Sequence, residues 1–176
     1  MIDELKQDLL RISPHKHCWI TFFLEFIKPG AFKAILCYRI SHYFHTKKIP
    51  FLAILFETLI KWRYASDIRR GAKIGGGIIL PHPYGIIIGG ESKIGENCHI
   101  GQHVTIGGNM NKQKEGQTQP IIGNNCFICA NSVVVGPITI GDNVIIGAGS
   151  VVVCDIPSNV VAAGNPCRII KPRVLS

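Results

Sequence analysis

An aliphatic residue returns at every sixth position through the last two thirds of the chain. The repeat forms three runs, separated by a two-residue slip after Leu80 and by a longer interruption from Gly107 to Ile121. The thirteen aliphatic positions are Ile68, Ile74, Leu80, Ile88, Ile94, Ile100, Ile106, Ile122, Ile128, Val134, Ile140, Ile146 and Val152. The next residue is glycine after eight of them. This regularity indicates a repeated structural unit.

A period of six fits neither an amphipathic helix, whose period is 3.6, nor a half-buried strand, whose period is two. It fits a chain that turns a corner every six residues, with one aliphatic side chain pointing inward from each short strand and glycine helping at the corner. Three such faces close one triangular coil, and stacked coils add parallel strands about 4.8 Å apart. The pattern therefore predicts a mainly β protein, a parallel β-helix of hexapeptide repeats. The period does not give the handedness, although parallel crossovers are generally right-handed.

The first 66 residues carry a different pattern. Residues 31–44 have apolar side chains at helical spacing, and Pro50 can open a second helix with Phe51, Leu55, Leu59 and Trp62 on one side. We expect short helices over residues 1–66, packed on the open end of the coil stack, and a β-helix with a C-terminal tail over residues 67–176. The aromatic side chains favour core packing or subunit contact, with peripheral contact to a lipid surface as the alternative.

The composition excludes several classes of protein. The chain is 47% apolar and 17% charged, and its 19 glycines have no three-residue period, so it is neither a disordered tail nor a collagen. Its apolar runs are shorter than the roughly 20 residues of a membrane span. The stretch Met1–Lys6 carries acids where a secretory signal has a basic start. We therefore expect a cytoplasmic protein.

The net charge of +8, from 19 Lys and Arg against 11 Asp and Glu, raises the question of an anionic partner. The basic residues are scattered, without a basic stripe and interleaved aromatics, so nucleic acid is not the expected partner. A phosphate-bearing small molecule or a membrane surface fits the charge equally well.

Seven cysteines are expected to be reduced in the cytosol. Cys126 and Cys129 form a single CxxC pair, which is weak evidence for zinc and lacks the βαβ context of a redox motif. Because both lie within the repeat, small apolar core residues are the favoured interpretation.

Several stretches of the chain match a known family of enzymes. They are Tyr38–His42, Asp67–Gly75, Gly77–His82, Val104–Gly108, Ile146–Val152 and Ala163–Arg168. In them the chain resembles the serine acetyltransferase branch of the hexapeptide-repeat acyltransferases. The combination of Asp67-Ile68 with His82 is more specific to this branch than the repeat itself. The resemblance implies a left-handed β-helix, a homotrimer, acetyl-CoA as co-substrate and a hydroxyl group as acceptor.

The chain departs from the family pattern at positions that bear on the acceptor. Pro81-His82 replaces an Asp-His sequence, Gly90 replaces a glutamate, and Gln119 stands where the family has a second histidine associated with the amino-acid acceptor. Shortened relatives of this kind often modify sugars. We therefore expect an acetyl-CoA-dependent O-acetyltransferase that acts on a sugar of a polysaccharide or lipopolysaccharide precursor. Serine O-acetylation, for cysteine biosynthesis, is the alternative.

Acyl transfer to a hydroxyl requires a base, hydrogen-bond donors for the oxyanion and a water-excluding site. His82 is the candidate base, because histidine is suited to proton transfer near neutral pH and this one lies between two prolines at an expected coil corner. Asp67, fifteen residues earlier, is expected to orient the imidazole as the aspartate does in a serine triad. Backbone N–H groups near Gly107 and Gly108 are the expected oxyanion donors.

The other candidate site residues follow from their positions and from the resemblance. The candidates for acetyl-CoA contact are Gly108, Ala130, Gly147 and Ala148 along the pantetheine arm, and Arg168 and Lys171 at the nucleotide phosphates. His103 and Gln119 are expected at the acceptor site. The loop Asn109–Pro120 is expected to shape the acceptor pocket of a neighbouring subunit.

Two interpretations from other classes stay open. Some hexapeptide β-helices bind zinc through three histidines and act as carbonic anhydrases, but His82, His99 and His103 fall at different phases of the repeat, so no metal is expected. The second is a β-helix that serves as a scaffold without activity. A rise in melting temperature with acetyl-CoA would separate an enzyme from such a scaffold.

Overall fold

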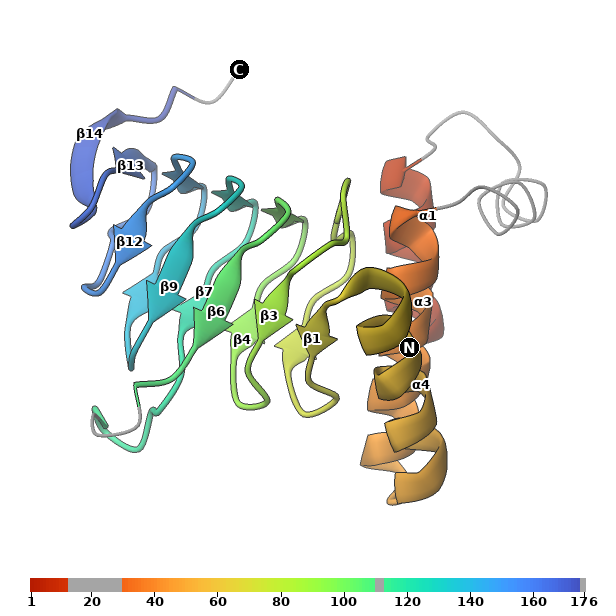
Figure 1. The fold of residues 1–176 in the computed structure, drawn as a ribbon. Coiled ribbons are helices and arrows are strands. Elements are labelled where there is room, and N and C mark those ends of the chain that lie inside the picture. The colour runs from red at the N-terminus through yellow and green to blue at the C-terminus, as the bar shows by residue number, and fades with distance from the viewer. Residues whose placement is uncertain (13–29, 110–112, 175–176) are drawn as a thin grey trace.

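The computed structural model describes residues 1–12, 30–109 and 113–174, and these form a left-handed parallel β-helix with three helices at one end (Figure 1). The helices are α1 (Ile2–Ile12), α3 (Ala31–Thr46) and α4 (Pro50–Tyr64). The strands are β1 (Asp67–Ile68), β2 (Lys73–Ile74), β3 (Ile87–Ile88), β4 (Lys93–Ile94), β5 (His99–Ile100), β6 (Thr105–Gly107), β7 (Ile121–Ile122), β8 (Phe127–Ile128), β9 (Val133–Val135), β10 (Thr139–Ile140), β11 (Ile145–Ile146), β12 (Val151–Val152), β13 (Val160–Ala163) and β14 (Arg168–Pro172). The predicted fold class is confirmed.

Three sheets form the faces of the prism. Sheet A has the order β1-β3-β6-β9-β12, sheet B the order β2-β4-β7-β10, and sheet C the order β5-β8-β11-β13-β14. All strand pairs are parallel except β13 with β14. The chain visits sheets A, B and C in turn, so each coil adds one rung to each sheet. On the outer face of sheet A, for example, Asp67, Ile87, Thr105, Val133 and Val151 lie in one column.

The interior of the prism is the aliphatic ladder that the period of six predicts. All thirteen repeat positions are buried, from Ile68 at 1% exposure to Val152 at 0%. Most of the described residues four positions later are buried as well, among them Ala72, Cys98 and Val104, whereas Tyr84, four positions after Leu80, is 44% exposed. Burial of a Val or Ile side chain stabilises a fold by about 1.5–3 kcal/mol, so this ladder is the main source of stability.

The glycines that follow the aliphatic positions have a different function from the one expected. Corner flexibility is provided mainly by asparagines with positive φ, such as Asn125 (φ 55°) and Asn143 (φ 57°). The glycines allow close stacking instead. A Cβ on Gly75 would lie 2.7 Å from the backbone of Gly95, and one on Gly95 would lie 2.7 Å from that of Gly123.

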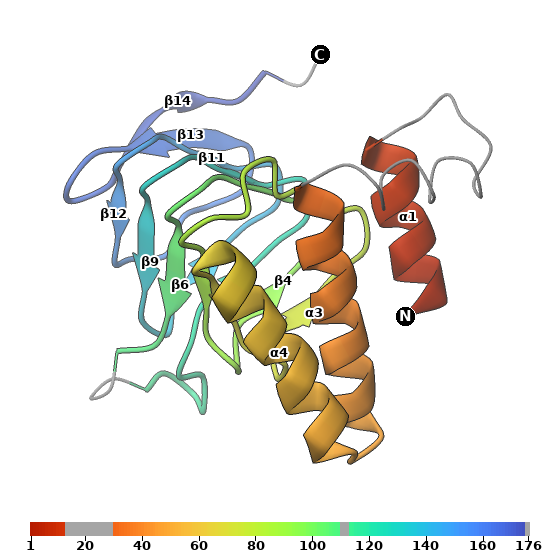
Figure 2. The same cartoon turned by 45° about the vertical axis from the view of Figure 1, so that its right-hand side comes forward.

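The helices cover the end of the β-helix where β1 begins. Ile35 and Tyr38 of α3 and Ile60 and Tyr64 of α4 are buried in the same core cluster as the aliphatic ladder. The Tyr38 hydroxyl donates a hydrogen bond of 2.7 Å to the carbonyl of Ala72. Figure 2 shows α3 and α4 side by side, with one end of the pair extending beyond the β-helix. Among the described residues, no helix is long and apolar enough to cross a bilayer.

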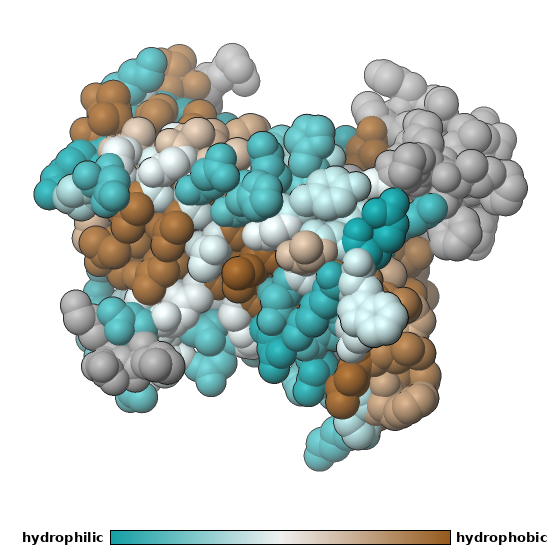
Figure 3. Space-filling view, in the orientation of Figure 1, coloured by the Kyte–Doolittle hydropathy of each residue, from teal (hydrophilic) through white to brown (hydrophobic). Residues whose placement is uncertain are grey.

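The apolar side of α4 does not pack in the core of the single chain. Phe51 is 76% exposed and Trp62 is 87% exposed, and Leu55 and Leu59 are also exposed. Figure 3 shows apolar surface over the part of the helices that extends past the β-helix. Core packing is therefore the wrong interpretation of this stripe, because α4 turns its other side, with Ala53 and Ile60, toward the protein.

A buried ion pair fastens α1 and α3 to the first coil. The Arg39 guanidinium donates to both carboxylate oxygens of Asp8, at 3.0 and 3.2 Å, and to the carbonyl of Gly75 at 2.6 Å. The N–H of Ile78 donates to Asp8 at 2.9 Å. Asp8 is 0% exposed and Arg39 is 3% exposed. Because both charges are fully hydrogen-bonded, the pair tolerates burial that a single charge would not.

Asp8→Ala is expected to lower the free energy of unfolding by about 3–5 kcal/mol, because it leaves the Arg39 guanidinium buried without its carboxylate. Chemical denaturation at neutral pH measures the change. The control is Asp3→Ala on the exposed side of the same helix, which should cost less than about 1 kcal/mol. An equal effect of the two substitutions would contradict the account of the ion pair.

Candidate active site

His82 lies in the turn that joins sheet C to sheet A in the first coil. Its side chain is exposed, and the turn spans residues 81–86, which accounts for the two-residue slip in the repeat. Ser66, which is 1% exposed, anchors this turn. Its hydroxyl donates to the carbonyl of Pro83 at 2.7 Å and accepts from the N–H of Ile86 at 3.0 Å. Two prolines and one buried serine thus fix the backbone that carries the imidazole.

Several other candidates lie below His82 along the same edge of the prism. We call the corners at residues 81–86, 101–104, 129–132 and 147–150 the C–A edge, because each joins sheet C to sheet A. Backbone hydrogen bonds join successive corners. The N–H of His103 donates to the carbonyl of Tyr84 at 2.9 Å. The N–H groups of Asn131 and Gly149 donate to the carbonyls of Gln102 and Ala130, each at 3.0 Å. The C–A edge therefore carries His82, His103, Ala130, Gly147 and Ala148.

His103 is in contact with the turn that carries His82. Its backbone has φ 55°, and a Cβ on Gly85 would lie 2.2 Å from its Nδ1 atom. Gly85 has φ 66°, a backbone conformation that favours glycine, and the His103 imidazole packs against it. Below His103 the C–A edge includes the small side chains of Ala130 and Ala148 beside the exposed Asn131. The two alanines leave room for an elongated molecule along the prism.

Asp67 does not contact His82 in the structure. Its Oδ1 atom lies 3.1 Å from Nζ of Lys61 and 4.0 Å from a guanidinium nitrogen of Arg69. The same two cations pair with the buried carboxylate of Glu57, at 3.4 and 3.0 Å. Asp67 thus belongs to a charge cluster that joins α4 to β1. No regular spacing in the sequence predicts this cluster. The only indications are a glutamate in an apolar helix and two arginines after β1.

The electrostatics of this cluster favour the ionised form of Glu57. Burial alone raises the pKa of Glu57, but hydrogen bonds from the side chain and backbone of Arg70, with the charges of Arg69 and Arg70, outweigh it and lower the pKa. The Arg70 guanidinium lies 2.8 Å from Glu57. Glu57 therefore remains a fixed negative charge beside the two cations that hold Asp67.

Gln119 and Gly108 lie on a different edge, at the corners that join sheet A to sheet B. We call these corners, which include residues 89–92, 108–109 and 113–120, the A–B edge. The side-chain carbonyl of Gln119 accepts from the N–H of Glu91 at 3.1 Å and from the hydroxyl of Ser92 at 3.0 Å. A Cβ on Gly108 would lie 2.9 Å from the carbonyl of Thr118. Within one chain, sheet A separates both residues from His82.

Arg168 and Lys171 lie on β14, at the end of the β-helix remote from the helices (Figure 1). Arg168 pairs with Ala163 in the antiparallel ladder. A Cβ on Gly147 would in turn meet the side chain of Ala163 at 2.8 Å. Both basic residues are exposed. Arg168 thus lies near the far end of the C–A edge, several rungs of about 4.8 Å from the His82 turn.

The histidines and cysteines do not converge on a metal site. His99 lies on sheet C and stacks on Phe127, with ring centroids 3.9 Å apart. Burial and the charge of Arg11 lower the pKa of His99. Cys126 is in the buried core cluster and Cys129 is half-buried, both as free thiols. Within residues 1–12, 30–109 and 113–174, no group of three His, Cys, Asp or Glu side chains has the geometry to hold a metal.

Comparison with known proteins identifies the family. A serine acetyltransferase from Helicobacter pylori (strain ATCC 700392 / 26695) is 36% identical over 142 residues, which cover 81% of this chain and 81% of the relative. The chain belongs to the serine acetyltransferase-like branch of the hexapeptide-repeat acyltransferases. The family model for bacterial transferase hexapeptide (six repeats) matches residues 119–154 of the chain. A serine acetyltransferase from Synechococcus elongatus is 38% identical over 142 residues. These cover 81% of this chain and 57% of that relative.

Solved structures agree with this family assignment. The crystal structure of Neisseria gonorrhoeae serine acetyltransferase has a TM-score of 0.86 and 30% identity, covering 99% of this chain and 66% of that one. A serine acetyltransferase from Brucella abortus strain S19, solved in complex with coenzyme A, has a TM-score of 0.87 and 26% identity, over 99% of this chain and 69% of that one. The chain thus spans about half to two thirds of the length of several relatives.

Proposed function

We propose that the protein is an acetyl-CoA-dependent O-acetyltransferase whose acceptor is serine. The main support is the family assignment together with an edge that carries an exposed, rigidly anchored histidine above a strip of small residues. Relatives named serine acetyltransferase have been solved with coenzyme A, with serine and with cysteine. The expected sugar acceptor finds no support among the relatives, which favour the serine alternative.

His82 is the proposed base of the reaction. Its imidazole takes the proton of the acceptor hydroxyl, and the oxygen attacks the thioester carbonyl. The carbon–sulfur bond then breaks, and the proton passes from His82 to the sulfur of coenzyme A, so the histidine returns to its starting state. Asp67 is the proposed orienting partner, and this role requires its carboxylate to turn away from Lys61.

The C–A edge is the proposed binding strip for acetyl-CoA. Ala130, Gly147 and Ala148 leave space for the pantetheine arm, and Arg168 and Lys171 provide positive charge for the nucleotide phosphates. Arg168 lies several rungs from His82, so an elongated co-substrate can reach from the basic end to the imidazole. These roles rest on position and resemblance.

The proposed site is completed by a second copy of the chain. His82 and His103 lie on the C–A edge, whereas Gly108, Gln119 and the loop lie on the A–B edge of the same chain. In a homotrimer, the loop of one protomer can approach the C–A edge of its neighbour, with His103 and Gln119 as acceptor contacts and Gly107–Gly108 as oxyanion donors. Apolar side chains on this side of the prism, Ile87 at 46% exposure and Val153 at 56%, are suited to subunit contact.

The wild-type protein is expected to release coenzyme A when acetyl-CoA and L-serine are supplied together, at least about tenfold faster than with nucleotide-linked or lipid-linked sugars. A thiol reagent that reports free coenzyme A follows the reaction. Transfer to a sugar without transfer to serine would contradict the serine assignment. No release with either acceptor, and no rise in melting temperature with acetyl-CoA, would favour a scaffold.

His82→Ala is expected to lower kcat/KM by about 10²–10⁴-fold, because the hydroxyl loses its base. Steady-state kinetics with size-exclusion chromatography measure activity and oligomeric state on the same samples, and the oligomer should not change. The control is His45→Ala, an exposed histidine on α3, which should retain full activity. Near-normal turnover of His82→Ala would remove the base assignment.

A further inference from the structure

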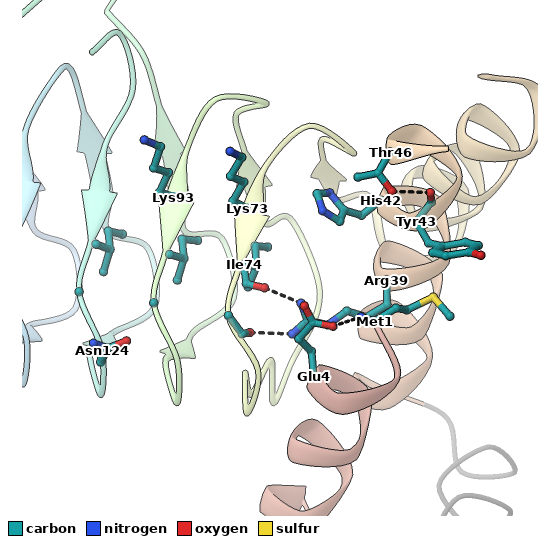
Figure 4. A pocket seen from close by; sticks show the side chains of 15 residues that line it. Met1, Glu4, Arg39, His42, Tyr43, Thr46, Lys73, Ile74, Lys93 and Asn124 are labelled. Atoms are coloured by element: carbon teal, nitrogen blue, oxygen red, sulfur yellow. Dashed lines mark hydrogen bonds and ion pairs between the residues drawn. The ribbon is translucent and has the colours of Figure 1, made fainter. Parts of the chain in front are cut away.

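A groove of about 580 Å³ lies between α3 and sheet B, away from the C–A edge (Figure 4). Sheet B is the one face of the triangular prism that does not border the C–A edge. The groove is lined on the helix side by Arg39, His42 and Tyr43, and on the sheet side by strands β2, β4 and β7. The acetyl-transfer reaction as proposed makes no use of it.

Two lysines stand side by side at this groove. Lys73 on β2 and Lys93 on β4 are register neighbours on adjacent parallel strands, and both are exposed. Figure 4 shows their side chains pointing in the same direction. Like charges directly opposite each other destabilise a sheet, and neither lysine has a carboxylate partner among the described residues. A shared anion removes this repulsion.

The helix side adds a further polar group to the groove. His42 is half-buried, and its Nδ1 atom lies 2.8 Å from the carbonyl of Arg70, so Nδ1 is the nitrogen that carries the proton there. The other ring nitrogen is left for a ligand. Arg39 also lines the groove, but its guanidinium is already bound to Asp8 and to two backbone carbonyls.

Three glycines form part of the floor of the groove for a structural reason. Gly75, Gly95 and Gly123 line it, and a Cβ at each position would lie 2.7 Å from backbone of the next coil. The stacking of the coils therefore requires glycine at these places, and the groove stays open as a consequence. Glu4, an acidic residue of the lining, lies beside Arg39, away from the lysines (Figure 4).

We propose that this groove binds a small phosphate-bearing anion between Lys73 and Lys93, at a site distinct from the acetyl-transfer edge. Two ammonium groups provide charge-assisted hydrogen bonds to phosphate oxygens, and the glycine floor admits the body of the ligand. The site does not depend on the proposed acetyl transfer, so either can fail without the other.

The test is isothermal titration calorimetry with inorganic phosphate and, in a second arm, with AMP as a phosphate monoester, at constant ionic strength set with chloride. The wild-type protein is expected to bind, and Lys73→Gln/Lys93→Gln is expected to bind at least about tenfold more weakly. Tighter binding of AMP than of phosphate identifies an ester as the ligand, and equal binding identifies the free anion. Both results support the site.

The matched control is Lys6→Gln/Lys48→Gln, which removes the same charge from exposed lysines outside the groove. It is expected to bind as the wild type does. The proposal is overturned by no binding to the wild type, by equal weakening in the two double variants, or by unchanged binding in Lys73→Gln/Lys93→Gln. A change of oligomeric state in that variant alone also overturns it, because the groove is then a subunit contact.

Discussion

The close stacking of coils around a continuous aliphatic ladder is the constraint on which the rest of this molecule depends. Each coil must lie about 4.8 Å from the next for the parallel ladders to form, and glycines such as Gly95 and Gly123 are required at that separation. The stacking aligns corners of successive coils. His103, Asn131 and Gly149 are far apart in sequence, yet they form one column below the turn that carries His82.

Because the corners are aligned, the candidate functional residues lie on separate edges and faces of the prism. The C–A edge combines a rigid turn with small residues beneath it, which suits an elongated substrate. The A–B edge carries the long loop and Gln119. Sheet B, on the side of the prism opposite the C–A edge, faces α3 across a groove with uncompensated positive charge. One chain therefore carries the residues of the proposed acetyl-transfer site on two separate edges, and the proposed anion site on a third part of the prism.

The fold could be predicted from the sequence because it depends on a period. Thirteen aliphatic positions gave the coils and the core, and the two-residue slip after Leu80 marked the unusual turn at His82. The handedness came from the resemblance alone, since the period contains no chirality. The reason for the glycines was misjudged, because the distance between coils, which excludes a Cβ, is not visible in one repeat.

The details of the site depend on contacts that have no period. Lys61, which holds Asp67, comes from a helix six residues upstream, and no spacing rule links it to His82. The side-chain carbonyl of Gln119 accepts hydrogen bonds from Glu91 and Ser92 because two corners stack on each other. The position of Gln119 in the chain does not reveal these hydrogen bonds. The sequence left core packing and subunit contact open for the apolar side of α4, because an amphipathic pattern does not reveal what covers it.

The central claim is that the His82 turn of one protomer works with the loop of another, and subunit complementation tests it most directly. Chains carrying His82→Ala are mixed with chains lacking loop residues 113–117, each almost inactive alone, and mixed trimers are isolated by two different tags. The account predicts recovery of activity to about a third of the wild-type value, since one of the three interfaces in each isolated mixed trimer combines an intact histidine with an intact loop. Mixed trimers without recovered activity would contradict it.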